Sequence, residues 1–303
     1  MYDLQIIKDS AEKLGFEYIE NEPLSKHTSF KIGGEAQLFI TVFTLEQLKA
    51  VVRLCKENEI ELFVLGKGSN LLISDKGMKG VVLTLDGDFK DISVKENKIT
   101  CGAGVNLARL CNFALDNSLS GLEFAFGIPG SVGGAAYMNA GAYGGEMKDV
   151  VTLVTHITRE GEVVTLDKTQ LDLSYRHSVY KTSDDIILFV TMELENGDKS
   201  DIKAKMDDFM DRRKTKQPLD FPSAGSVFKR PQGNFAGTLI EQCGLKGKTI
   251  GGAQVSEKHA GFIINIGNAT CEDVLNLVKF VQDTVKEQTG YFLEREIIHI
   301  ERN

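Results

Sequence analysis

The sequence contains no tryptophan, only five prolines and only five cysteines among its 303 residues. The cysteines are scattered and never form a C-x-x-C pair, which argues against both a disulfide framework and a zinc site. Free thiols buried in a reducing compartment are expected instead. The five histidines show no metal-ligand spacing either, so we expect no metal.

Long apolar runs and an excess of basic residues are also missing. No stretch approaches the ~18 apolar residues that a membrane span requires. The first residues, Met1 to Gln5, lack the basic and apolar regions of a secretory signal. A net charge of −8 argues against general nucleic-acid binding. We therefore expect a cytoplasmic protein without membrane or nucleic-acid partners, and infer no obligate protein partner.

Three common signatures of enzyme sites are absent. The sequence has no G-x-x-x-x-G-K-[ST] and no G-x-G-x-x-G between a strand and a helix with an acidic residue farther on, which argues against P-loop and ordinary Rossmann sites. It also has no G-x-S-x-G, which makes an acyl-transfer hydrolase a poor candidate. A flavin or nucleotide held by another topology stays open.

Two glycine-rich segments, both predicted to be loops, are the most informative features present. Residues 127–145 contain seven glycines among small residues, and residues 65–70 read Leu-Gly-Lys-Gly-Ser-Asn. Glycine is costly to order, but it lets backbone N–H groups approach a phosphate closely. Tight turns are the simpler interpretation of either segment alone. Together they predict a pyrophosphate held from two sides.

Capping and periodicity signals predict alternating helices and strands. Thr44 to Gln47 has the form of a capping box and predicts a helix with Leu48, Val51 and Cys55 on its apolar face. Further helices are predicted from Asn106 to about 117, over 200–214, near 237–243, and from Thr270 to a stop at Gly290. Strands are predicted over 61–65, 71–73, 80–85, 98–104, 150–158, 162–166, 185–194, 261–266 and 291–300.

The polar stretch 196–200 is the clearest boundary signal. It predicts a division into residues 1–198, with subdomains of roughly 1–86 and 87–198, and a compact module over 199–303. The helix after this boundary ends in a basic cluster, Arg212 to Lys216. That cluster is either a solvated helix end or a funnel for a polyanionic substrate, and both interpretations stay open.

Three segments carry side chains suited to acid–base chemistry. Arg176 lies in Tyr-Arg-His-Ser, Ser226 follows a glycine in a predicted turn, and Glu296 lies in an otherwise apolar strand. An ion-paired arginine, a turn serine and a strand-edge glutamate would explain each one alone. As a set, they suit a reaction that develops negative charge on a carboxylate-bearing substrate.

Taken in order along nearly the whole chain, these motifs resemble the UDP-N-acetylenolpyruvoylglucosamine reductase (MurB) family. The matching segments are 24–34, 65–70, 127–145, 175–178, 224–229, 250–253, 255–262 and 293–296. The resemblance implies an α+β fold of the vanillyl-alcohol-oxidase-like (PCMH-type) FAD class. The two subdomains of 1–198 would bind FAD, and 199–303 would bind substrate.

The resemblance also implies the cofactor contacts. Relatives with covalent flavin carry a histidine in the first loop, whereas Ser69 and Asn70 follow Gly68 here, which favours non-covalent FAD. The implied FAD-binding residues are Gly66, Lys67, Gly68, Ser69, Asn70, Leu71, Ile128, Pro129, Gly130, Ser131, Gly133, Gly134, Asn139, Gly141 and Ala142.

The implied reaction uses NADPH to reduce the flavin, which then passes hydride to the enolpyruvyl group of UDP-N-acetylglucosamine enolpyruvate. Arg176 and Glu296 would stabilise the resulting charge, and Ser226 would donate the proton that completes UDP-N-acetylmuramate for peptidoglycan synthesis. Lys216, Arg230 and His259 would contact the substrate.

Some positions depart from the family pattern. The strand predicted at 185–194 follows the Tyr-Arg-His-Ser motif too closely for the substrate-covering Tyr loop of some members, so the chain resembles the shorter, second type. Arg230 and Ile298 replace an Asn and a basic residue of some members. The alternatives are an FAD oxidase or sugar-lactone dehydrogenase of the same fold, and a nucleotide-sugar-binding regulator.

Overall fold

The computed structural model describes residues 2–302, so the outermost residues of the predicted domains, 1 and 303, lie outside it. The chain forms two compact units, each with its own hydrophobic core. Unit 1 combines Met1–Glu20, Leu38–Lys67 and Gly80–Arg212, and unit 2 combines Asn21–Gln37, Gly68–Lys79 and Arg213–Asn303.

The predicted helix after Thr44 is confirmed as α2, Leu45–Glu57. The Thr44 side chain accepts a hydrogen bond from Gln47 N, and the Gln47 side chain accepts one from Thr44 N, which completes the capping box. Three elements of this region lie outside the sequence-based predictions: α1 (Gln5–Leu14), β1 (Glu17–Pro23) and β2 (Glu35–Val42).

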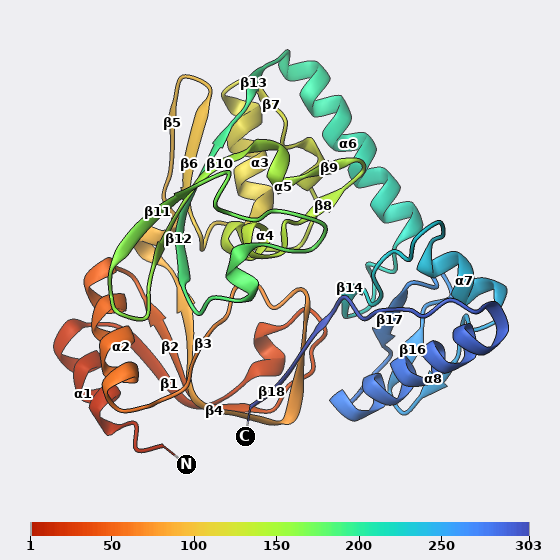
Figure 1. The fold of residues 1–303 in the computed structure, drawn as a ribbon, viewed down its shortest axis with the longest axis horizontal. Coiled ribbons are helices and arrows are strands. Elements are labelled where there is room, and N and C mark those ends of the chain that lie inside the picture. Colours follow the sequence, from red (N-terminus) through yellow and green to blue (C-terminus); the bar gives the residue numbers. More distant parts are fainter. Residues whose placement is uncertain (1, 303) are drawn as a thin grey trace. The chain divides into compact units, whose positions relative to one another are not determined.

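A five-stranded sheet in the order β11-β10-β12-β6-β5 forms the middle of unit 1 (Figure 1). Its strands are β5 (Ile92–Lys95), β6 (Lys98–Gly102), β10 (Val151–Ile157), β11 (Val163–Asp167) and β12 (Ile186–Glu193). The strands predicted at 150–158 and 162–166 are confirmed as the antiparallel pair β10–β11. The predicted helix after Asn106 is also confirmed, as α3 (Leu107–Asp116), and the Asn106 side chain accepts from Arg109 N at 2.7 Å.

We expected the glycine-rich segment 127–145 to be a loop throughout, and this prediction was wrong. Its centre is helix α4, Val132–Met138, with Ser131 as N-cap. Buried Val132, Ala135 and Ala136 give this short helix an apolar side, and it packs against β12 and β6. The hairpin of β8 (Gly141–Ala142) and β9 (Gly145–Glu146) follows, and then α5 (Met147–Val150). Apolar packing on strands that are distant in sequence thus outweighs the low helix propensity of glycine.

The two short strands predicted at 71–73 and 80–85 form one strand, β4, Leu71–Leu85. Gly77 and Gly80 have positive φ, and a Cβ at these positions would collide with the backbone of Glu35 and of Glu61, respectively. Glycine therefore allows β4 to continue past these neighbouring segments. In unit 1, β3 (Leu62–Val64) pairs in parallel with the second half of β4. In unit 2, β18 pairs in parallel with the first half. The predicted final strand 291–300 is shorter and later, because β18 spans Ile298–Arg302.

Unit 2 contains a four-stranded sheet in the order β14-β17-β16-β15. Its strands are β14 (Ser223–Ser226), β15 (Thr249–Ile250), β16 (Ala253–Val255) and β17 (Phe262–Asn265). The turn predicted at 224–226 is therefore a strand, with an irregular register between Ser223 and Ser226. The predicted helices are confirmed as α7 (Ala236–Gln242) and α8 (Cys271–Thr289), the latter begun by the Thr270 capping box and ended by Gly290 at φ 77°.

The predicted boundary before residue 199 coincides with the start of α6, Lys199–Lys216, whereas the units divide between Arg212 and Arg213. The remaining pair of strands is β7 (Leu119–Ser120) with β13 (Glu195–Asn196). All five cysteines are free thiols, as predicted, and four of them are buried. Between residues 2 and 302, no helix is long and apolar enough to cross a membrane.

Candidate active site

The first glycine loop presents a row of main-chain N–H groups. Among the described residues, no protein acceptor lies opposite the N–H groups of residues 66–69. Backbone N–H groups need a partner, and consecutive N–H groups in a glycine turn form a concavity for anions. Gly66 and Lys67 are exposed, so a ligand can reach them. The loop therefore fits the predicted contact with a cofactor phosphate.

Both glycines of this loop are required by close neighbours. A Cβ on Gly68, which has φ 58°, would lie 2.4 Å from the carbonyl oxygen of His27. In unit 1, a Cβ on Gly66 would lie 2.6 Å from Ser131 Oγ. Gly66 of the first glycine segment thus lies against Ser131 of the second.

The second glycine segment has fewer N–H groups available to a ligand than we expected from its glycines. The N–H of Val132 donates to Val105 O at 2.8 Å, and that of Gly133 donates to Ala103 O at 2.9 Å. The N–H of Gly134 donates to Ser131 Oγ at 3.3 Å. The start of α4 is therefore satisfied inside the protein. Gly133 serves packing, because a Cβ there would lie 2.7 Å from Ala103 Cβ.

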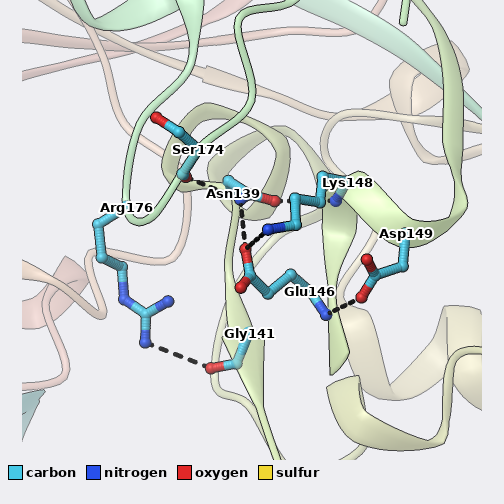
Figure 2. A network of polar contacts seen from close by, with 7 residues as sticks. All are labelled: Asn139, Gly141, Glu146, Lys148, Asp149, Ser174 and Arg176. Carbon is cyan, nitrogen blue, oxygen red and sulfur yellow. Dashed lines mark hydrogen bonds and ion pairs between the residues drawn. The ribbon is translucent and has the colours of Figure 1, made fainter. Parts of the chain in front are cut away.

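Asn139 is fully buried at the C-terminus of α4, with φ 44° (Figure 2). Its Nδ2 donates to Glu146 Oε2 at 2.7 Å and to Ser174 O at 2.8 Å, and its Oδ1 accepts from Lys148 N at 2.8 Å. Both N–H donors of the amide are engaged, so the side chain joins α4, the β9–α5 segment and the turn that carries Arg176.

Arg176 lies in a tight turn, with φ 55°, that Ser174 and His177 close through two main-chain hydrogen bonds. Its Nη2 donates to Gly141 O at 3.3 Å, at the base of the β8–β9 hairpin (Figure 2). Fully buried Ser178 anchors the same motif, because its Oγ donates to the Tyr137 carbonyl of α4 at 2.7 Å. The motif thus holds a guanidinium beside the second glycine segment.

In unit 2, Ser226 and Glu296 lie on two adjacent segments. The N–H of Glu296 donates to Val227 O at 2.7 Å, and Phe228 forms a bridge with Arg295. Ser226 ends β14 with an exposed side chain, and Glu296 is half-buried. The structure therefore brings these two predicted catalytic residues onto one pair of segments, while Arg176 belongs to unit 1.

Asn70 connects the first glycine loop to the Glu296 segment. Its Nδ2 donates to Glu296 O at 3.3 Å, and its carbonyl accepts from Ile298 N at 2.9 Å. Leu71 continues this contact as the first β4 residue paired with β18. The expected cofactor loop and a predicted catalytic residue thus share a backbone framework.

The three predicted substrate residues all belong to unit 2. Burial lowers the pKa of His259, and the lone pair of its Nδ1 accepts from Gly261 N at 3.1 Å. Lys216 is exposed at the end of α6. Arg230 is exposed, and its guanidinium lies 4.0 Å from the centre of the Phe235 ring. Two cations and a neutral imidazole are thus available for an anionic ligand.

Of the other predicted cofactor residues, Ile128, Pro129 and Gly130 form the turn before α4. The N–H of Ile128 donates to Ala125 O at 3.0 Å, Pro129 is exposed, and the Gly130 carbonyl accepts from Leu107 N at 3.0 Å. Sequence reasoning from the residues missed Ser29, which contacts the first loop. Its only signal was its place in the family-like segment 24–34.

Comparison with known proteins first defines the class. Residues 36–167 match the family model of an FAD-binding domain, and residues 217–300 match that of the C-terminal domain of UDP-N-acetylenolpyruvoylglucosamine reductase. The chain is thus an FAD-dependent oxidoreductase, which confirms the predicted fold class and the FAD cofactor.

Whole-chain relatives define the family. UDP-N-acetylenolpyruvoylglucosamine reductases from Clostridium botulinum strain 657 and Listeria innocua are 52% and 51% identical, over 91% of this chain and 90% and 93% of theirs. The crystal structure of the Thermus caldophilus reductase superposes with a TM-score of 0.82 at 36% identity, covering 94% of this chain and 99% of that one. This chain belongs to the UDP-N-acetylenolpyruvoylglucosamine reductase family, as the sequence motifs predicted.

Proposed function

We propose that this protein reduces UDP-N-acetylglucosamine enolpyruvate to UDP-N-acetylmuramate, with NADPH as reductant and non-covalent FAD, in the cytoplasm. The observation that carries the proposal is the pairing of the Ser226 and Glu296 segments, which are tied through Asn70 to the expected cofactor loop. The substrate is that of the related UDP-N-acetylenolpyruvoylglucosamine reductases.

We propose that residues 66–71 and the segment from Ile128 to Ala142 hold FAD, with phosphate oxygens against the N–H groups of residues 66–69. Bound FAD supplies the hydride chemistry, accepting from NADPH and giving to the methylene carbon of the substrate. The residues of this chain must then stabilise one negative charge and donate one proton.

Arg176 and Glu296 would stabilise the negative charge that develops on the substrate. Addition of hydride to the methylene carbon moves the electron pair of the double bond toward the substrate carboxylate. The positively charged guanidinium of Arg176 stabilises that charge. Glu296 would act as a hydrogen-bond partner of the same group. These interactions strengthen as the charge develops, which is the condition for lowering the barrier.

Ser226 supplies the proton to the adjacent carbon and so completes the new C–H bond. A serine hydroxyl is a weak acid, and it therefore needs a strongly basic carbon as acceptor, which the hydride step provides. The exposed position of Ser226 at the end of β14 supports this assignment, because a substrate can reach it.

We further propose that residues 199–303 bind the substrate and that Lys216, Arg230 and His259 contact its anionic and polar groups. Between the Arg176 turn and β12, which begins at Ile186, lies only the short 3-10 helix η4 (Val179–Lys181) with a few connecting residues, rather than the Tyr loop of some members. Substrate capture therefore rests on unit 2 residues rather than on such a loop.

The deciding experiment follows the visible spectrum and NADPH oxidation of the purified protein, with and without the enolpyruvyl nucleotide sugar. We expect a yellow protein whose NADPH oxidation depends on this substrate. A colourless protein after gentle purification would overturn the proposal. Bound flavin without substrate-dependent NADPH oxidation would favour an FAD oxidase or sugar-lactone dehydrogenase instead.

A further inference from the structure

Ser29 makes hydrogen bonds to two segments that are far apart in sequence. Its N–H donates to the carbonyl of Gly68 at 3.2 Å, and its Oγ donates to the carbonyl of Ser223 at 2.7 Å. Gly68 belongs to the loop expected to hold the cofactor phosphates. Ser223 is the first residue of β14, the strand that ends at Ser226. All three residues belong to unit 2.

The segment around Ser29 is itself well fixed. The His27 ring lies 2.9 Å from Glu22 Oε1, and the His27 carbonyl touches Gly68 so closely that only glycine fits. The Thr28 side chain is buried, and its Oγ1 donates to Ile32 O at 3.0 Å. This segment can therefore act as a rigid support for both of its neighbours.

The strand β14 is short and irregular. Its register with β17 shifts between Ser223 and Ser226, where Gly225 has φ 78°. Two main-chain hydrogen bonds flank the strand, from Asn265 N to Pro222 O and from Val227 N to Gly261 O, both at 2.9 Å. Because the ladder is interrupted between these bonds, the Ser29 hydrogen bond to the first residue of β14 adds to the order of the strand.

We propose that Ser29 is a positioning residue that couples occupancy of the cofactor loop to the order of the Ser226 strand. A phosphate held by residues 66–69 fixes the Gly68 carbonyl, Ser29 is fixed with it, and the Ser29 hydroxyl then holds Ser223. The protein thus orders its proton donor when the cofactor is in place. The assignment of Ser226 as proton donor rests on the proposed function, whereas the coupling does not.

A separate link serves the Glu296 segment. Asn70 contacts Glu296 and Ile298 directly, without passing through Ser29. Loss of the Ser29 hydroxyl should therefore loosen residues 222–228, together with the Glu296 N–H that donates to Val227 O, and leave residues 298–301, which pair with β4, as they were. This selectivity separates a coupling role from a general loss of stability.

The test is amide hydrogen exchange of the full chain with and without added FAD, comparing Ser29→Ala with the wild type. In the wild type, FAD should slow exchange in the peptides covering 66–71 and 222–228. In Ser29→Ala, the 222–228 peptide should exchange about fivefold to tenfold faster in the presence of FAD, the factor that one hydrogen bond provides. The protection of 66–71 should remain.

Ser25→Ala is the matched control, because between residues 2 and 302 the Ser25 hydroxyl has no hydrogen-bond partner although it lies in the same segment. It should exchange like the wild type, and Ser29→Thr, which keeps the hydroxyl, should restore protection. Equal protection of 222–228 in Ser29→Ala and the wild type would overturn the proposal, as would a loss of protection that extends equally to 298–301.

The half-reactions separate this inference from the proposed function. Flavin reduction by NADPH should change little in Ser29→Ala, while reoxidation by the enolpyruvyl substrate slows about tenfold, the effect of misplacing a proton donor. If wild-type flavin is not reoxidised by that substrate, the proposed function fails, and the exchange experiment still decides the coupling.

Discussion

At the scale of single residues, Ser226 carries the most specific functional assignment. It is exposed at the end of β14, and the paired segment presents Glu296. Ser226→Ala should leave flavin reduction by NADPH nearly unchanged, because no proton from Ser226 is needed there. The substrate half-reaction should slow by about 10²- to 10⁴-fold, the usual contribution of a positioned acid.

Stopped-flow absorbance of the flavin measures the two steps separately. Ser223→Ala is a matched control, because Ser223 lies in the same strand and contributes its carbonyl rather than its side chain to the bond with Ser29. Equal slowing of both half-reactions in Ser226→Ala would reject the assigned role.

Gly68 is the residue whose substitution should be least tolerated in the cofactor loop. Gly68→Ala combines a positive φ with a contact of 2.4 Å to His27 O. We expect a loss of about 1–3 kcal/mol from backbone strain, together with a protein purified largely without FAD. Gly233→Ala has a comparable φ of 75° but open space around its Cβ, so it should keep its flavin. The ratio of flavin absorbance to protein absorbance decides between these outcomes.

At the scale of elements, α4 and the segments that follow it depend on Asn139. Asn139→Ala removes three hydrogen bonds and places alanine at φ 44°. Because Asn139 is fully buried and its amide joins three segments, we expect the unfolding free energy to fall by about 2–4 kcal/mol. Urea unfolding measures this change.

Asn117→Ala provides the comparison, because Asn117 also follows a helix but is exposed and has φ −94°. It should cost less than about 1 kcal/mol. If both variants lose the same free energy of unfolding, the hydrogen bonds of Asn139 do not stabilise the protein as we propose.

Elements were predicted well wherever their signals were local. The capping boxes at Thr44 and Thr270 and the cap at Asn106 begin helices at the predicted residues. The prediction of a loop over 127–145 was wrong because α4 is stabilised by packing on β12, which lies far away in sequence. The prediction of a long last strand was wrong because pairing with β4 begins only at Ile298.

At the scale of the whole molecule, histidines with lowered pKa values make stability depend on pH. Burial lowers the pKa of His156, and nearby Asp185 opposes that shift only in part. Burial also lowers the pKa of His259 and of His299. The unfolded chain therefore binds protons more readily, so the free energy of unfolding should fall as pH drops below the unfolded value of about 6.5.

Urea unfolding at pH 7.5, 6.5 and 5.5, values spaced about the ordinary histidine pKa, measures this dependence. His156→Gln should flatten it, because His156 lies buried against Tyr180 Oη at 3.0 Å, and a glutamine there cannot take up a proton. His177→Gln is the control, since the His177 side chain is far more exposed. An unchanged slope in His156→Gln would show that other groups control the pH response.

The sequence by itself determined the family, the FAD fold class and the residue types of the chemistry, because these depend on motifs that are contiguous in the chain. Only the tertiary structure decided which backbone N–H groups stay available to a ligand, since Val105 and Ala103 occupy those at the start of α4. It also decided that Gly68, Ser29 and Ser223 are linked. Their hydrogen bonds join residues up to 194 positions apart, and no local pattern records such contacts.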